Sequence, residues 1–289
     1  MMVGTLAGKN LAFIHAHKRP CPIEEVLERQ EYLHHLKTNE ADPRNFIIFT
    51  EHNHVYTMDP DKTWYKLLYK SRDDKSNCLL PAPLLAVRRS GSITYHGPGQ
   101  LVCYLILDMK DMGFQGPLHL TSVIDETIKE VLEKFGIQAY TVSELCNIPD
   151  NDIKNYLISR KIITVSCEGK IKGSMEAAGV WVVTANRGVK KIASRGITIS
   201  KGVTKFGFAL NVTTCLEFFD WIYPCGLDIK MTSIRELTRQ ETKVHEIAEL
   251  VAEILTKKTI YPTDDEIAQN PRERSAKLRA ITRIANQES

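Results

Sequence analysis

Two residues in the second half of the chain carry the side chains of a covalent acyl transfer. Cys225 lies in the run Tyr-Pro-Cys-Gly-Leu, and Lys191 lies upstream in the run Lys-Lys-Ile-Ala-Ser. A free cysteine has a pKa near 8.5 and is only about 3 % thiolate at pH 7, so a nearby ammonium favours its reactive form. Pro224 fixes its own φ and Gly226 permits a sharp bend. The segment is therefore typical of a nucleophile held on a rigid turn, although an isolated Pro-Cys-Gly run is also typical of a turn with a buried thiol.

Lysine is a suitable proton-transfer partner for such a thiol. Partial desolvation lowers the pKa of a lysine from its usual value of about 10.4 towards neutrality, which lets the amine accept and return a proton. Lys190 and Lys191 both compete for this role. In an extended segment two consecutive side chains point to opposite faces, so we expect only one of them to reach the thiol.

Four short blocks give these two residues a setting. In chain order they are Thr-Tyr-His-Gly-Pro-Gly-Gln at 94–100, Lys-Ile-Ala at 191–193, Gly-Phe-Ala-Leu-Asn at 207–211 and Pro-Cys-Gly at 224–226. In this order they resemble the lipoyl(octanoyl) transferases, the octanoyltransferases of lipoate biosynthesis, over roughly residues 10 to 240. The resemblance implies a biotin/lipoate protein ligase-like fold of the α/β class, with α+β mixed sheets in a single catalytic domain. It also selects Lys191 over Lys190.

The resemblance further implies a reaction and its partners. Cys225 would take an octanoyl group from octanoyl-acyl carrier protein as a thioester, and a lysine of an apo lipoyl domain would then attack to give an amide. The implied acceptors are the lipoyl domains of 2-oxoacid dehydrogenase E2 subunits and the glycine cleavage H protein. We expect no cofactor, metal, nucleic acid or membrane to take part.

The resemblance also assigns residues that line the substrate site. Several positions depart from the family pattern, among them Ser90 in place of a glycine, Arg195 in place of an apolar residue and Phe206 in place of a histidine. Arg195 would act on the thiol if it pointed inward and would join a basic docking face if it pointed outward. The expected lining residues are Arg89, Ser90, Gly91, Ser92, Ile93, Thr94, Tyr95, His96, Ser194, Arg195, Gly196, Gly207, Phe208 and Ala209, with His52 as a further candidate.

Two other functions are compatible with the same sequence. An ATP-dependent lipoate or biotin protein ligase would use the lysine but would need no cysteine nucleophile. A catalytically impaired homologue would only bind lipoyl domains, as these departures from the pattern allow. The chain contains no Gly-x-x-x-x-Gly-Lys-Ser/Thr phosphate loop, which favours a transferase that needs no ATP.

Composition bounds the class of protein and its compartment. The chain has 289 residues, 43 % of them hydrophobic, and a net charge of +3, without a run of about 20 apolar residues. Seven cysteines without a Cys-x-x-Cys pair indicate a reducing compartment. We expect a eukaryotic mitochondrial protein, with bacterial cytoplasm as the alternative. A basic face for an acidic carrier is expected from Lys190, Lys191, Arg195, Lys201 and Lys205.

Periodicity predicts the elements that position these residues. Helices are expected at 22–36, 122–135 and 244–255, and strands at 45–50, 54–57, 101–107, 179–183, 196–199 and 206–212. A long loop is expected at 59–83 and an insertion at 144–175. We therefore predict a catalytic domain over 10–257, including that insertion, and a charged tail over 258–289.

Overall fold

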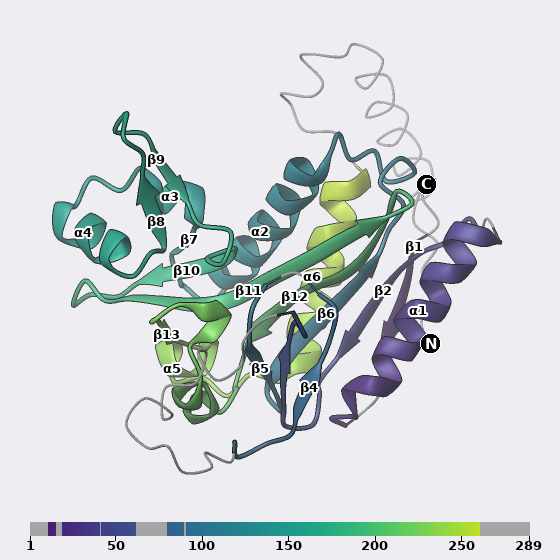
Figure 1. Cartoon of the computed structure of the whole chain (residues 1–289). Coiled ribbons are helices and arrows are strands. Elements are labelled where there is room, and N and C mark those ends of the chain that lie inside the picture. Colours follow the sequence, from purple (N-terminus) through teal and green to yellow (C-terminus); the bar gives the residue numbers. More distant parts are fainter. Residues whose placement is uncertain (1–10, 16–18, 41, 62–79, 90, 261–289) are drawn as a thin grey trace, which may run out of the picture.

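A mixed sheet of eight strands lies at the centre of the part of the chain that the computed structural model describes, which is residues 11–15, 19–40, 42–61, 80–89 and 91–260. Neighbouring strands pair antiparallel, except β1 with β2 and β11 with β13, which are parallel. The order across the sheet is β1 (Leu11–His15), β2 (Asn45–Thr50), β6 (Gln100–Ile106), β12 (Val203–Asn211), β11 (Val189–Ser200), β10 (Gly179–Val183) and β7 (Ala139–Thr141), with β13 (Lys230–Met231) added to β11 (Figure 1).

Helices α2 (Pro117–Glu133) and α6 (Val244–Ile260) lie side by side against one face of this sheet (Figure 1). Strand β6 shows why both faces must be covered, because all seven of its residues are buried. Leu101, Cys103 and Leu105 pack with α2 and α6, whereas Val102 and Tyr104 belong to the core on the opposite face. The apolar run at 101–107 is thus confirmed as a buried central strand.

Two groups of elements share the opposite face. Helix α1 (Ile23–Asn39) covers the half near β2, β6 and β12. The half near β10 is covered by a second core that contains Trp181, Tyr56 and Tyr95. That core draws on the small sheet β4 (Leu84–Ala86), β3 (Val55–Met58) and β5 (Thr94–His96) and on the 3-10 helix η2 (Leu216–Trp221), with η3 (Pro224–Gly226) directly after it.

The region predicted as an insertion contains its own helices and strands. It contains α3 (Val142–Cys146), α4 (Asn151–Ser159), β8 (Ile163–Val165) and β9 (Ile171–Gly173), and its apolar residues, such as Leu145 and Leu157, enter the second core. Each short element contributes only a few apolar side chains. Because most residues of this stretch are polar, its apolar residues do not stand out in the sequence as a core.

Other predicted boundaries shift by a few residues. The helix expected at 122–135 begins five residues earlier, because Pro117 is well suited to the first turn of a helix. Helix α6 runs to Ile260, so the predicted boundary at 257 falls inside a helix, and α5 (Ile234–Thr238) precedes it. Most of the loop predicted at 59–83 lies outside the described residues, and no described helix is long and apolar enough to cross a membrane.

Candidate active site

Cys225 is held on a bend that an ordinary residue rarely adopts. Its φ of 59° and ψ of 16° lie in the left-handed region, and the following Gly226 is also left-handed, with φ of 79°. The Cys225 amide donates to the carbonyl of Ile93 at 2.8 Å, which fastens the bend to the end of β5. Backbone strain of this kind persists only where the surroundings impose it, and it concentrates at functional sites.

Lys191 is completely buried, and its side-chain nitrogen faces the thiol. Nζ lies 3.4 Å from Cys225 Sγ and 3.4 Å from the carbonyl oxygen of Glu176, and it sits 5.4 Å from the centre of the Trp181 ring. Gly179 makes room for this side chain, because a Cβ at that position would lie 3.1 Å from Lys191 Cε and 2.1 Å from the carbonyl oxygen of Ala193. A buried amine is thereby fixed beside a single sulfur atom.

A β-bulge in β11 places a second polar residue against the thiol. Val180 pairs with Ala193 but Trp181 pairs with Lys191, so Ile192 is an extra residue on β11. The extra residue reverses the alternation, and side chains three positions apart then point to one face. Ser194 accordingly joins Lys191 at the site, with its Oγ 3.8 Å from Cys225 Sγ.

Lys190 points away from the thiol, as the alternation of an extended strand predicts. Its Nζ lies 3.0 Å from Glu236 Oε1, on α5. The expectation that only one of the two lysines reaches Cys225 is confirmed, and Lys191 is the one.

Arg89 braces the segment that leads to β5. Its guanidinium donates to the carbonyl oxygens of Thr57 and Ser92, each at 2.8 Å, across a turn in which Gly91 has a φ of 97°. Burial lowers the pKa of Arg89, and the nearby Cys225 thiol opposes that shift. Ser92, Ile93 and Thr94 are buried here, while Ser90 lies outside the described residues.

Tyr95, His52 and His96 each lie at hydrogen-bond distance from a polar side chain. Tyr95 Oη lies 2.6 Å from Nδ1 of His54, and its ring stacks on Phe218 at 4.6 Å. His52 Nε2 lies 2.8 Å from Tyr104 Oη, and its ring lies 6.1 Å from that of His96.

His96 is neutral near pH 7, because its surroundings lower its pKa. Burial and, to a lesser extent, the neighbouring His52 lower its pKa to about 3. Its Nδ1 lies 2.7 Å from Gln100 Oε1.

Arg195 neither points towards the thiol nor joins a basic docking face, the two positions expected from the sequence. Its guanidinium makes a bidentate ion pair with Asp125 of α2, with N–O distances of 2.9 and 3.0 Å. Burial raises the pKa of Asp125, and Arg195 counteracts that rise. The arginine thus ties β11 to a helix instead of adding charge at the thiol.

The block at 206–209 lies on β12, next to β11. Phe208 packs in the core beneath α2 and α6, and Ala209 packs in the core beneath α1. Gly207 pairs with Gly196 of β11, and a Cβ on Gly207 would come within 2.2 Å of the carbonyl oxygen of Cys103. Phe206 is left-handed at φ of 62°, and its amide donates to Gln30 Oε1.

The backbone donors around the thiol are already engaged. The amides of Cys225, Gly226 and Leu227 donate to the carbonyls of Ile93, Tyr223 and Pro224. Any donor for an oxyanion at the thiol must therefore come from elsewhere or share its hydrogen. The described residues include no group of three or more His, Cys, Asp or Glu side chains placed to hold a metal ion.

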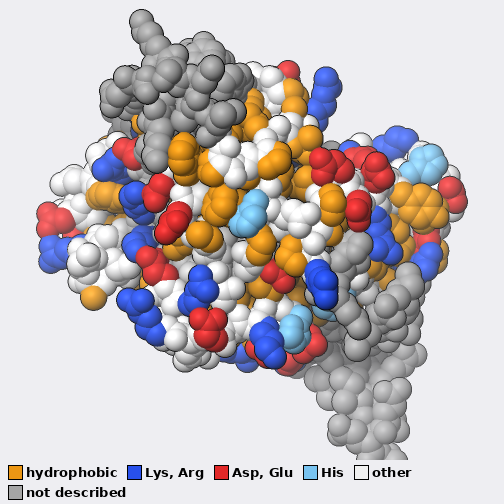
Figure 2. Space-filling model, turned by 90° about the horizontal axis from the view of Figure 1, so that it is seen from below, with side chains coloured by type: hydrophobic (Ala, Val, Ile, Leu, Met, Phe, Trp, Pro, Cys, Tyr) orange, Lys and Arg blue, Asp and Glu red, His pale blue; other side chains and the backbone are white. Residues whose placement is uncertain are grey.

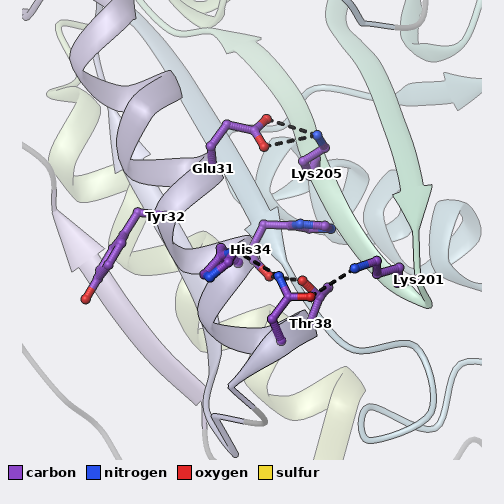
Figure 3. A pocket seen from close by; sticks show the side chains of 8 residues that line it. Glu31, Tyr32, His34, Thr38, Lys201 and Lys205 are labelled. Atoms are coloured by element: carbon purple, nitrogen blue, oxygen red, sulfur yellow. Dashed lines mark hydrogen bonds and ion pairs between the residues drawn. The ribbon is translucent and has the colours of Figure 1, made fainter.

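The expected single basic face does not form. Besides the partners of Lys190 and Arg195, Lys205 pairs with Glu31 at 2.9 Å and Lys201 contacts Asn39, beside a surface pocket between α1 and the ends of β11 and β12 (Figure 3). No residue predicted for the site lines this pocket. The face in Figure 2 likewise mixes acidic and basic side chains around exposed hydrophobic ones.

Three groups around Lys191 were not predicted from the sequence, namely the Trp181 ring, the Glu176 carbonyl and Gly179. Trp181 forms one wall of the lysine site, and its Nε1 donates to the carbonyl of Ala177, which fixes the turn that presents the Glu176 carbonyl. Gly179 supplies the space. The one sequence signal for Trp181 was its place in the apolar run 179–183. A strand buried on both faces places alternate residues in different cores, so Trp181 faces the opposite core from Val180 and Val182.

Comparisons with known proteins show the family and the fold of this chain. The family model of the lipoyl protein ligase A/B catalytic domain matches residues 22–256. An octanoyltransferase of Bacteroides fragilis (strain YCH46) is 32 % identical over 82 % of this chain and 95 % of that protein. An octanoyltransferase of Caldicellulosiruptor saccharolyticus is 30 % identical over 81 % of this chain and 83 % of that protein.

Solved structures show the same fold at lower identity. The bi-partite lipoate protein ligase system of Thermoplasma acidophilum gives a TM-score of 0.51 at 11 % identity, covering 93 % of this chain and 90 % of that chain. A lipoate-protein ligase A bound with ATP gives 0.51 at 13 % identity and covers 92 % of both chains.

The chain therefore belongs to the lipoyl protein ligase A/B catalytic domain family. Within that family it belongs with the octanoyltransferases, acyltransferases that transfer an octanoyl group in protein lipoylation. A second family model, for the MraW methylase family, matches residues 229–284. The described part of that range forms β13, α5 and α6, which share the sheet and core of the acyltransferase domain.

Proposed function

We propose that Cys225 carries the octanoyl group as a thioester and that Lys191 moves the proton in both half-reactions. The observation that supports this most directly is the 3.4 Å contact between Lys191 Nζ and Cys225 Sγ. A buried amine beside a thiol on a strained bend has the arrangement of an activated nucleophile and its base.

In the first half-reaction, Lys191 accepts the thiol proton as Sγ attacks the carbonyl carbon of octanoyl-acyl carrier protein. A new carbon–sulfur bond forms, the bond to the carrier sulfur breaks, and the leaving thiolate takes the proton from Lys191. In the second half-reaction, the amine of the acceptor lysine attacks the thioester, and the proton it loses returns through Lys191 to Sγ. An amide replaces a thioester, so the exchange needs no ATP.

The predicted lining residues divide into two sets around this pair. Ser194 contacts the thiol directly, and Ile93, just before β5, accepts the hydrogen bond of the Cys225 amide. Strand β11 becomes partly exposed from Ser194 onwards, and Gly196 lies opposite Gly207. The octanoyl chain is proposed to lie along this stretch, where each buried methylene contributes about 0.8 kcal/mol.

The partners and the compartment are part of the same proposal. The donor is octanoyl-acyl carrier protein, and the acceptors are lipoyl domains of 2-oxoacid dehydrogenase E2 subunits and the glycine cleavage H protein. A mitochondrial location is proposed, while the bacterial relatives favour the alternative of a bacterial cytoplasm. Residues 10–257 are proposed as the catalytic unit and 258–289 as an accessory tail.

Intact-mass measurement tests the nucleophile. Incubating the full chain with octanoyl-acyl carrier protein is expected to add one octanoyl group, and Cys225→Ala is expected to abolish the adduct because it removes the thiol that contacts Lys191. Cys167→Ala is the matched control, because Cys167 is exposed and its loss should leave the adduct unchanged. An adduct that persists in Cys225→Ala contradicts the assignment, and incorporation of free octanoate that depends on ATP indicates a ligase.

A further inference from the structure

A line of hydrogen bonds connects His96 with the main chain of Lys191. Nδ1 of His96 lies 2.7 Å from Gln100 Oε1, and Gln100 Nε2 donates to Asn211 Oδ1 at 2.9 Å. Asn211 Nδ2 then donates to the carbonyl oxygen of Thr232 at 3.0 Å, and the Thr232 amide donates to the carbonyl oxygen of Lys191 at 2.9 Å. Gln100, Asn211 and Thr232 are each at most 2 % exposed.

Each group along this line of hydrogen bonds accepts from the one before it and donates to the next. The side-chain amides of Gln100 and Asn211 therefore each have a single orientation. Gln100 Nε2 also lies 3.3 Å from the carbonyl oxygen of Tyr95, so this nitrogen faces two acceptors and Gln100 Oε1 is left to accept from His96. Asn211 Oδ1 in turn accepts from Gln100, and only its Nδ2 can donate to Thr232. Buried amides satisfied on both ends resist rotation, because turning either one leaves like groups facing each other.

The main chain at Lys191 needs such support because the β-ladder is interrupted there. The bulge at Ile192 breaks the regular pairing with β10, and the short strand β13 ends at Met231, one residue before Thr232. Thr232 therefore binds Lys191 through its amide, while its carbonyl accepts the hydrogen bond from Asn211. Asn211 is the last residue of β12 and Gln100 the first of β6, and the two are cross-strand neighbours.

We propose that Asn211, supported by Gln100, is a positioning residue for Lys191. Its hydrogen bond to the Thr232 carbonyl fixes Thr232, and Thr232 in turn fixes the main chain of Lys191 beside the bulge. Lys191 Nζ is thereby held within reach of Cys225 Sγ. Asn211 touches neither reacting atom, so its effect is transmitted through the main chain. This inference rests on the role proposed above for Lys191, but the contact between the amine and the thiol can be measured without acyl transfer.

Asn211→Asp is the sharpest variant, because it keeps the size of the side chain but replaces the Nδ2 donor with an oxygen that faces the Thr232 carbonyl. The matched control is Asn147→Asp, where Nδ2 likewise donates to a carbonyl, that of Ser143 at 3.1 Å, on an exposed helix end. Gln100→Glu is a second variant, in which the acceptor for His96 remains and the donor to Asn211 is lost.

The readout is alkylation of Cys225 by iodoacetamide at pH 7, followed on the Cys225 peptide by mass spectrometry. Loss of one buried hydrogen bond corresponds to about a tenfold change, so Asn211→Asp is expected to slow alkylation about tenfold. Gln100→Glu should slow it less, and Asn147→Asp should leave it unchanged. In octanoyl transfer, kcat of Asn211→Asp should fall about 10- to 100-fold with KM unchanged, because misplacement acts on the chemical step.

A Lys191→Met background separates positioning from general damage. There, Asn211→Asp should slow alkylation no further, since the amine that it positions is gone. Equal slowing in both backgrounds, or a loss of thermal stability with unchanged alkylation in both Asn211→Asp and Gln100→Glu, overturns the proposal. If Cys225→Ala still forms the octanoyl adduct while Asn211→Asp slows alkylation only when Lys191 is present, the proposed function fails and the positioning role stands.

Discussion

At the residue scale, three departures from regular backbone geometry bring the amine and the thiol together. Cys225 adopts a left-handed conformation, Ile192 is the extra residue of a bulge, and Gly179 has a φ of 132°. A non-glycine residue in the left-handed region costs free energy, whereas glycine adopts a positive φ readily. The contact between Lys191 and Cys225 is thus a property of the backbone as much as of the two side chains.

Gly179→Ala is expected to damage both stability and activity. The added Cβ would collide with the Ala193 carbonyl and press on the Lys191 side chain, at a cost of more than about 3 kcal/mol. Gly169→Ala is the control, because Gly169 also has positive φ, at 76°, but has open space around it, so we expect a loss of about 1 kcal/mol. Urea unfolding measures both, and equal losses would show that the space beside Lys191 is not limiting.

At the element scale, ion pairs connect the sheet to the helices on its two faces with different strength. Arg195 joins β11 to α2 through Asp125, and the two side chains are 17 % and 9 % exposed. Lys205 joins β12 to α1 through Glu31, which is 57 % exposed. Water screens the second pair far more than the first, so the two contacts differ in what their removal costs.

Arg195→Met is expected to lower the free energy of unfolding by about 2–4 kcal/mol, because Asp125 stays buried without its partner. Lys205→Met, which breaks the exposed pair, is expected to cost less than about 1 kcal/mol. The double variant Arg195→Met, Asp125→Leu should regain most of the loss, since an apolar pair needs no charge compensation. Denaturant unfolding decides the matter, and a double variant no more stable than Arg195→Met would rule out this explanation.

At the scale of the whole molecule, the site lies on the face of the sheet opposite α2 and α6, which two separate hydrophobic cores cover. The core beneath α1 and the core around Trp181 pack on opposite halves of that face. Along β11, burial ends at Ala193 and partial exposure begins at Ser194. The Cys225 thiol is half-buried near this boundary, while Lys191, two residues before Ala193, is fully buried.

Acid is expected to weaken the folded molecule through His96. Its pKa falls to about 3 from an ordinary value of 6.5, with burial as the main cause. Between these values the unfolded chain binds a proton that the folded chain does not, so stability decreases as pH falls below about 6.5, by about 2 kcal/mol at pH 5. Urea unfolding of His96→Gln should therefore show a loss between pH 7 and pH 5 that is about 2 kcal/mol smaller than that of the unaltered chain. Identical losses would contradict the prediction.

Local patterns in the sequence were sufficient for several of these features. The apolar run at 101–107 predicts a central strand, because both faces of that strand must be buried. The Pro-Cys-Gly run predicts a bend, and the two-residue alternation of a strand predicts that Lys190 and Lys191 diverge. All of these depend on neighbours within a few positions, where residue type alone restricts the backbone.

Contacts between distant segments were decided only by the tertiary structure. The single extra residue at Ile192 turns Ser194 towards Cys225, and no local pattern in β11 marks it, because the bulge arises from pairing with β10. Arg195 pairs with Asp125 on a helix 70 positions away, and Asn211 donates to the Thr232 carbonyl 21 positions away. Hydrogen bonds and ion pairs depend on distances of a few tenths of an ångström between such segments, which only the packed fold establishes.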